Sequence, residues 1–170
     1  MMEDNVVLIG MPGSGKSTIG VVLAKVLGYR FIDSDLVIQE SEKRLLKDII
    51  EEDGLEEFIR IEERVNASLE AENSVIATGG SVIYGPDAMR HLRNIGTVIY
   101  LKLSYDSVKE RLGDLAERGV VLRPDQDLYA LYEERCPLYE KYAHITVNCE
   151  DMTIEQSVKQ IVNQLEKCIF

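Results

Sequence analysis

The stretch that decides the fold runs from Asn5 to Val26 and reads NVVLIGMPGSGKSTIGVVLAKV. Its apolar beginning, residues 5–9, predicts a buried parallel strand. Residues 10–17 fit the phosphate-loop pattern G-x-x-x-x-G-K-[ST], and apolar residues at helical spacing follow the loop. A strand, a glycine-rich loop and a helix in this order are the context that the pattern requires, which disfavours a chance match on a glycine-rich turn.

The loop has the residue types that hold the phosphates of a nucleoside triphosphate. Gly13 and Gly15 let the backbone curl so that successive N–H groups point at phosphate oxygens. The N-terminus of the following helix adds a partial positive charge. Lys16 is expected to reach the β and γ phosphates, and the Ser17 hydroxyl to bind Mg²⁺. The sequence therefore predicts that this chain binds a nucleoside triphosphate.

Length and composition are those of an ordinary globular domain. The 170 residues, of which 45% are hydrophobic and 29% charged, predict one domain spanning 1–170. No apolar run approaches the ~20 residues of a membrane span, and the first residues lack the features of a signal peptide. We therefore expect a cytoplasmic protein. The three cysteines are too widely spaced for a disulfide framework or a zinc site.

The net charge of −11 bears on the partners of the protein. Nucleic acid and anionic membranes both require a basic surface, so neither is expected to bind. A monomer is the expected state, with an oligomer as the alternative.

Strand and helix patterns alternate along the whole chain. The expected strands are residues 5–9, 30–32, 74–78, 97–102 and 144–148. Amphipathic helices are expected at 55–69, at 104–112 with Ser104 as N-cap, and after a capping box formed by Thr153 and Gln156. This alternation predicts a three-layer α/β fold with a parallel sheet, whose ligands lie beyond the carboxyl ends of the strands.

Two polar segments, residues 40–54 and 113–127, interrupt this pattern. A long polar insertion in such a domain is often a lid over the site. The second segment carries arginines that could cover a phosphate, so we favour it as the lid over a solvated surface loop.

Acidic residues follow the second expected strand. Asp33 and Asp35, at positions i and i+2, are expected to point the same way into the site. One of them can hold Mg²⁺ through water, and the other can accept a hydrogen bond from a substrate hydroxyl. The alternative is an N-cap cluster for the next helix, served by Ser34 or Asp35.

Further candidates lie at the third strand and in the second half of the chain. The pair Gly79-Gly80 allows a ligand to approach the backbone, although an ordinary tight turn explains it equally well. Arg135 lies beside Pro137, and a proline-fixed bend could hold its guanidinium still for bidentate carboxylate binding.

Taken together, these motifs resemble the shikimate kinase family over nearly the whole chain and in the right order. The matching segments are GMPGSGKST (10–18), FIDSD (31–35), DGLEEFIRIEE (53–63), TGGS (78–81) and RCPLY (135–139). The resemblance implies a five-stranded parallel sheet with a lid at approximately 113–127 and an acceptor-binding helical region at approximately 34–64. It also implies transfer of the γ-phosphate of ATP to the 3-hydroxyl of shikimate. The implied partners are therefore ATP and a small anionic acceptor, shikimate or a similar compound.

The resemblance implies roles for individual residues. The implied nucleotide-binding set is Gly13, Ser14, Gly15, Lys16, Ser17, Thr18 and Arg111. The implied acceptor-binding set is Asp35, Arg60, Gly79, Gly80, Ser81 and Arg135. Ser17 and Asp33 are the implied ligands of Mg²⁺, and the implied catalytic residues are Lys16, Asp35 and Arg118, the last as the lid arginine over the transferring phosphate.

The departures from the family pattern fall on the acceptor and lid side. Ile59 stands where the family has an arginine, and Arg60 lies one step, or ~100°, around the helix. Leu55 replaces a glutamate and Ser81 replaces a third glycine. In the lid, Arg118 and Arg123 compete for the same role.

We therefore predict an ATP-dependent small-molecule kinase that resembles shikimate kinase. One alternative is a related metabolite kinase that acts on a sugar acid or a polyol. Another is an ATP-binding regulatory protein that does not turn over. ADP release with and without shikimate distinguishes the three.

Overall fold

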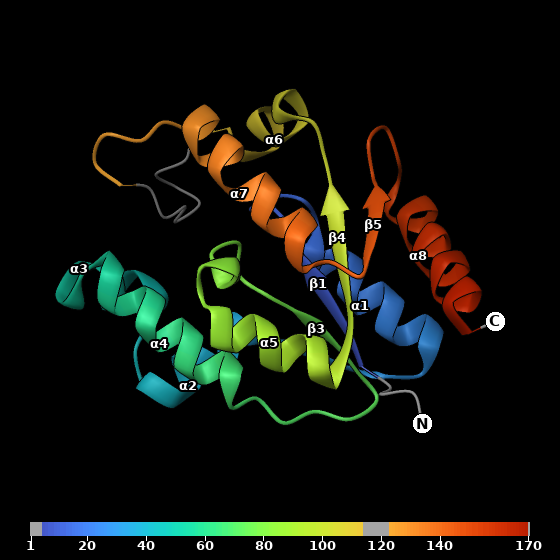
Figure 1. Cartoon of the computed structure of the whole chain (residues 1–170), viewed down its shortest axis with the longest axis horizontal. Coiled ribbons are helices and arrows are strands. Elements are labelled where there is room, and N and C mark those ends of the chain that lie inside the picture. Colours follow the sequence, from blue (N-terminus) through green and yellow to red (C-terminus); the bar gives the residue numbers. More distant parts are fainter. Residues whose placement is uncertain (1–4, 114–122, 170) are drawn as a thin grey trace.

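A five-stranded parallel sheet forms the centre of the structure, a computed structural model that describes residues 5–113 and 123–169 (Figure 1). The strands are β1 (Asn5–Ile9), β2 (Arg30–Asp33), β3 (Ser74–Ala77), β4 (Gly96–Lys102) and β5 (Ile145–Asn148). Their order across the sheet is β2-β3-β1-β4-β5, and every neighbouring pair is parallel. The predicted α/β fold and its five strands are confirmed.

The central strand β1 is buried along its whole length. It pairs with β3 on one side and β4 on the other, so that Val7 lies between Ile76 and Val98. Helices cover both faces, which is why its sequence is a continuous apolar run without alternation. Because the strands are parallel, the loops that follow β1, β2 and β3 emerge at the same edge, where the ligand site is expected.

Helices pack on both faces of the sheet (Figure 1). Helices α1 (Lys16–Leu27) and α8 (Ile154–Ile169) lie together on one face, and α5 (Pro86–Ile95) and α7 (Leu128–Tyr142) lie on the other. Helix α6 (Tyr105–Leu112) follows β4 and begins at the predicted cap, where Ser104 Oγ accepts from the Ser107 amide at 3.2 Å. The predicted capping box of α8 is present too, with reciprocal bonds between Thr153 and Gln156.

Three helices form a lobe beside the sheet (Figure 1). These helices are α2 (Ser34–Glu42), α3 (Leu46–Asp53) and α4 (Leu55–Ala67). They share an apolar cluster made of Ile38, Ile49, Phe58, Ile61 and Val65. The polar segment 40–54 is therefore not a loop: it contains the end of α2 and all of α3, whose few apolar residues turn inward.

The region around Arg135 is a helix that contains Pro137 in its interior, and no break occurs there. On the same helix Tyr139 is fully buried, whereas Tyr129 is 53% exposed. A 3-10 turn, η1 (Val82–Tyr84), follows β3 and packs against α7.

The expected lid, 113–127, falls largely outside the described residues, and so does Arg118. Within the described ranges, no helix has the length and apolarity needed to cross a membrane.

Candidate active site

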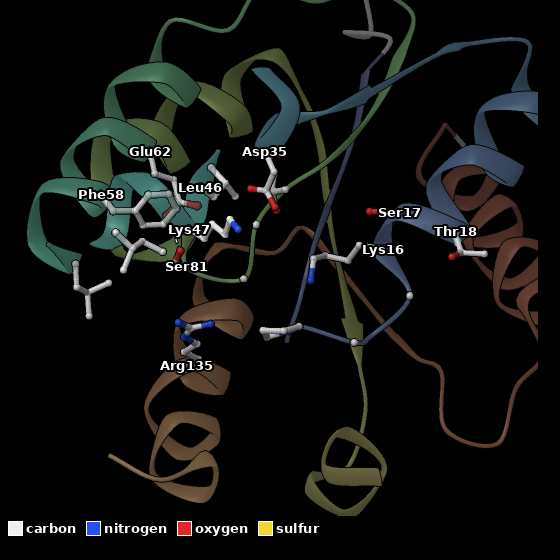
Figure 2. Close-up of a pocket in the computed structure, with 18 of the residues that line it drawn as sticks. Lys16, Ser17, Thr18, Asp35, Leu46, Lys47, Phe58, Glu62, Ser81 and Arg135 are labelled. Carbon is white, nitrogen blue, oxygen red and sulfur yellow. Dashed lines mark hydrogen bonds between the residues drawn. The ribbon is translucent and has the colours of Figure 1, made fainter. Parts of the chain in front are cut away.

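A pocket of about 720 Å³ opens at the edge of the sheet where the loops after β1 and β3 meet α2 (Figure 2). Its size is typical of a site for a small ligand. The phosphate loop and α1 form one end, and α3, α4 and α7 form the other. The polar residues that line it are Lys16, Ser17, Thr18, Asp35, Lys47, Glu51, Glu62, Thr78, Ser81 and Arg135.

Lys16 lies in the bend of the phosphate loop, and its side chain is almost fully buried. Its ammonium group donates to the carbonyl oxygens of Gly10 at 2.7 Å and Met11 at 2.9 Å. Burial lowers the pKa of Lys16 to about 8, and the nearby Asp35 carboxylate opposes this shift. The end of the loop therefore holds a cation where phosphates would enter, at the first residue of α1.

The other predicted nucleotide residues surround the same loop. Ser17 and Thr18 are exposed in the first turn of α1, and both line the pocket. Arg111 reaches over the loop from α6, with Nη1 3.5 Å from the carbonyl oxygens of Gly13 and Ser14. The fold thus brings Arg111 across nearly a hundred residues to the loop.

Asp33 and Asp35 were predicted to point the same way from the end of one strand, but they belong to different elements. Asp33 ends the strand and is itself the N-cap of α2, because its Oδ1 accepts from the Asp35 amide at 3.0 Å. Asp35 belongs to the first turn of α2, so the alternation of a strand does not apply to the pair. Asp35 lines the pocket, whereas Asp33 is not among the lining residues.

Two carboxylates converge on Gly79. A methyl group added at Gly79 would lie 2.8 Å from Asp35 Oδ1 and 2.9 Å from Glu62 Oε2, so only glycine leaves room for both. Burial, with a smaller contribution from Asp33, raises the pKa of Asp35 to about 6. Burial also raises the pKa of Glu62 to about 7, although Ser81 Oγ donates to Glu62 Oε1 at 2.6 Å.

One carboxylate oxygen of Glu62 lacks a hydrogen-bond donor within the described part of the chain. Among the described residues, no group donates to its Oε2, which is buried. A buried carboxylate oxygen without a donor is costly, and this one lies at the pocket. A hydroxyl group of a bound ligand could satisfy it.

Arg135 is held on the opposite side of the pocket and is 1% exposed. Its Nε lies 3.3 Å from the Tyr84 hydroxyl, and its guanidinium lies over the Tyr84 ring at 5.4 Å. A methyl group at Gly80 would meet Arg135 Nη1 at 2.9 Å. Tyr139 donates to the Gly80 carbonyl at 2.6 Å and fixes this backbone. The guanidinium is therefore preorganised beside the 79–81 turn, as bidentate carboxylate binding requires.

The structure does not bring every predicted residue to the pocket. Asp35, Gly79, Gly80, Ser81 and Arg135 all line it. Arg60 does not: its side chain is 68% exposed and pairs with Glu57 at 2.8 Å on the outer face of α4. Ile59, next to it, packs against the apolar cluster of the lobe.

The sequence analysis gave no role to Glu62, Phe58 or Lys47, which all line the pocket. Phe58 and Glu62 lie four residues apart on one face of α4, a spacing that could have indicated a shared surface. Lys47 lies in the helical region expected at 34–64, but no spacing or motif distinguished it from its neighbours.

A phosphate loop at one end of a pocket, with paired carboxylates and a buried arginine at the other, defines a P-loop small-molecule kinase. The family model described as "Shikimate kinase" matches residues 12–166. The chain is 39% identical over 167 residues to the shikimate kinase of Mycobacterium avium, covering 96% of this chain and 94% of that protein. The chain belongs to the shikimate kinase family.

Solved structures of the family have the same fold. The shikimate kinase of Acinetobacter baumannii, in complex with shikimate, superposes with a TM-score of 0.86 at 30% identity, covering 96% of this chain and 93% of that one. The enzyme of Aquifex aeolicus gives a TM-score of 0.85 at 34% identity and covers 98% of both chains.

Proposed function

We propose that this kinase transfers the γ-phosphoryl group of ATP to a hydroxyl of shikimate. The observation that carries the proposal is the shared pocket of Lys16, Asp35 and Arg135, which come from three distant parts of the chain. The likeness to a relative whose structure contains shikimate supports the choice of acceptor. Phosphoryl transfer needs positioning and charge stabilisation more than covalent chemistry, and the pocket supplies both.

The phosphate loop would hold the triphosphate. Lys16 would exchange its bonds to the Gly10 and Met11 carbonyls for phosphate oxygens, which are stronger acceptors because they are charged. Arg111 lies where it would flank the nucleotide at the loop. These residues are the nucleotide end of the site.

The residues at this end also fit a magnesium ion. Mg²⁺ takes one or two protein oxygens and fills its remaining positions with phosphate oxygens and water. The exposed Ser17 hydroxyl and the second carboxylate oxygen of Asp33 are of this kind, and the first already serves as N-cap. No cluster of three or more acidic, histidine or cysteine side chains that could enclose a metal occurs within 5–113 and 123–169. When bound, the ion would neutralise phosphate charge.

Asp35 would receive the acceptor hydroxyl. Its pKa of about 6 leaves it ionised at neutral pH yet closer to that of a general base than an ordinary aspartate. Arg135 would bind the acceptor carboxylate, and Glu62 Oε2 would accept from a second hydroxyl of the acceptor.

We further propose that residues 113–127 act as a lid, with Arg118 covering the transferring phosphate, in a monomeric cytoplasmic enzyme. Hydrogen exchange measured by mass spectrometry tests the lid. Protection at 113–127 should rise only when nucleotide and acceptor are both present. Unchanged exchange under saturating ligands would contradict this role.

The activity itself is tested by ADP release from ATP and Mg²⁺, with and without shikimate, and by phosphorus NMR of the product. Shikimate-dependent ADP release with one phosphoester formed at the 3-hydroxyl supports the proposal. Turnover with gluconate or quinate but not with shikimate would indicate a sugar-acid or polyol kinase. Binding of ATP without turnover on any acceptor would indicate a regulatory protein.

A further inference from the structure

In the described part of the chain, three cationic side chains line the pocket: Lys16, Lys47 and Arg135. Lys16 belongs to the nucleotide end, and Arg135 is fixed beside Tyr84 and Gly80. Lys47 comes from the first turn of α3. Figure 2 shows its ammonium group directed into the cavity from the side opposite Arg135. Lys47 therefore adds to the pocket a positive charge that neither the phosphate loop nor Arg135 supplies.

Lys47 differs in its ion-pair partners from the arginines of the lobe. Arg44 pairs with Glu52 at 3.0 Å and with Asp53 at 2.7 Å, and Arg64 pairs with Glu42. Within the described residues, no acidic side chain forms an ion pair with Lys47. This includes Glu51, which lies one turn further along α3. The ammonium group is thus left to face the cavity.

The surroundings of Lys47 strengthen its effect on a ligand. Leu46, Ile50, Leu55 and Phe58 form the wall of the pocket on this side. Charges that face an apolar wall interact more strongly than charges surrounded by water. Helix α4 contributes no cation here, because Arg60 points to solvent and pairs with Glu57. A second positive charge for the acceptor end can therefore come only from α3, as far as the described residues show.

We propose that Lys47 is the second cation that binds the acceptor carboxylate, together with Arg135, and that it makes the pocket selective for anionic acceptors. The inference rests on the proposed function, since it takes shikimate as the acceptor. Arg135 offers a rigid planar fork, whereas Lys47 offers a point charge on a flexible stem. The arginine fixes the orientation of the carboxylate, and the lysine adds affinity from the other side of the pocket.

The test compares shikimate with its uncharged methyl ester. Steady-state kcat/KM for both acceptors is measured for the wild type, Lys47→Met, Lys47→Arg and the control Lys159→Met. Lys159 is an exposed lysine on α8, remote from the pocket. Lys47→Met should lower the preference for the acid over the ester roughly 2- to 5-fold, as expected for one partly screened charge contact. Lys47→Arg should keep most of the preference, and Lys159→Met should keep all of it.

Two further measurements separate a charge effect from a structural one. The KM for ATP should stay within about twofold in all variants, because the nucleotide end is untouched. Raising the salt concentration should weaken shikimate binding more in the wild type than in Lys47→Met, because Lys47 is exposed to ions.

The outcomes distinguish this inference from the proposed function. A wild type that phosphorylates shikimate, with an unchanged preference in Lys47→Met, overturns the role of Lys47 and leaves the function standing. A wild type that phosphorylates quinate or gluconate instead overturns the proposed acceptor, and the same comparison of acid and ester is then made with that acceptor. If the wild type phosphorylates none of these acids, both proposals fail.

Discussion

Replacing Gly79 by alanine should impair catalysis while leaving the fold intact. The new methyl group would lie 2.8 Å from Asp35 Oδ1 and 2.9 Å from Glu62 Oε2, whereas ordinary contacts begin at 3.4 Å. The two oxygens must therefore retreat by 0.6 Å (3.4 minus 2.8) and 0.5 Å (3.4 minus 2.9). Both atoms are at the ends of side chains, which can rotate away.

The expected magnitude follows from this displacement. The unfolding free energy should change by less than about 1 kcal/mol, because no backbone clash arises. A misplacement of about 1 Å in a reacting group can cost about 100-fold in rate, so a shift of half that size should lower kcat on the order of 10-fold or more. The KM for ATP should stay near that of the wild type.

The assay is steady-state ADP release at saturating shikimate, with urea unfolding to measure stability. Gly80→Ala is the matched comparison, since its methyl group would meet Arg135 Nη1 and Pro12 Cδ, both at 2.9 Å. It should raise the KM for shikimate more than it lowers kcat. The Asp35→Ala/Gly79→Ala double variant should be little slower than Asp35→Ala alone. A folded Gly79→Ala enzyme with kcat within threefold of the wild type would refute the reasoning.

Four other substitutions test the site. Lys16→Ala should lower turnover by about 100-fold or more through loss of one preorganised charge, and near-normal turnover in the ADP assay would contradict the phosphate-loop assignment. Because burial raises the pKa of Asp35 to about 6, kcat should rise with pH through that value, and Asp35→Asn should be slow with no such step in its pH profile. Burial raises the pKa of Glu62 from 4.5 to about 7, so the folded protein binds this proton more tightly than the unfolded chain does. The free energy of unfolding, measured with urea, should therefore fall as the pH rises from about 4.5 to about 7, and it should fall less steeply in Glu62→Gln. Tyr84→Phe removes the hydroxyl 3.3 Å from Arg135 Nε and should raise the KM for shikimate about 3- to 10-fold in the same kinetic assay. An unchanged KM would show that this hydroxyl does not position the guanidinium.

The fold and the nucleotide end could be predicted from the sequence because local features determine them. The apolar run 5–9, the glycines of the loop and the helix after it lie next to one another in the chain, and their chemistry has a fixed order. The caps at Ser104 and Thr153 were equally local and are confirmed. The roles of the individual site residues stay predictions until they are tested.

The acceptor end was harder to predict because it depends on contacts between distant segments. Asp35 and Glu62 meet only because Gly79 leaves room between α2 and α4. Arg60 was proposed for the site, yet one step around the helix carries its side chain to solvent. Lys47 lies within the acceptor-binding helical region at 34–64 that the resemblance implied, but no sequence pattern singled it out. Helix α3 is short and polar, and its apolar residues are explained only by their packing within the lobe.

The apolar cluster that α2, α3 and α4 share has a consequence for how acceptor specificity can diverge. Its five buried residues all lie in the lobe, and Val37 packs against both this cluster and the main core. The lobe supplies Asp35, Lys47 and Glu62 to the pocket, while the phosphate loop and Arg135 come from elements built around the sheet. Substitutions within residues 34–67 can therefore reshape the acceptor end without disturbing the ATP end. Exchanging this segment between relatives should exchange acceptor preference, so the lobe is a natural unit for building chimeric kinases.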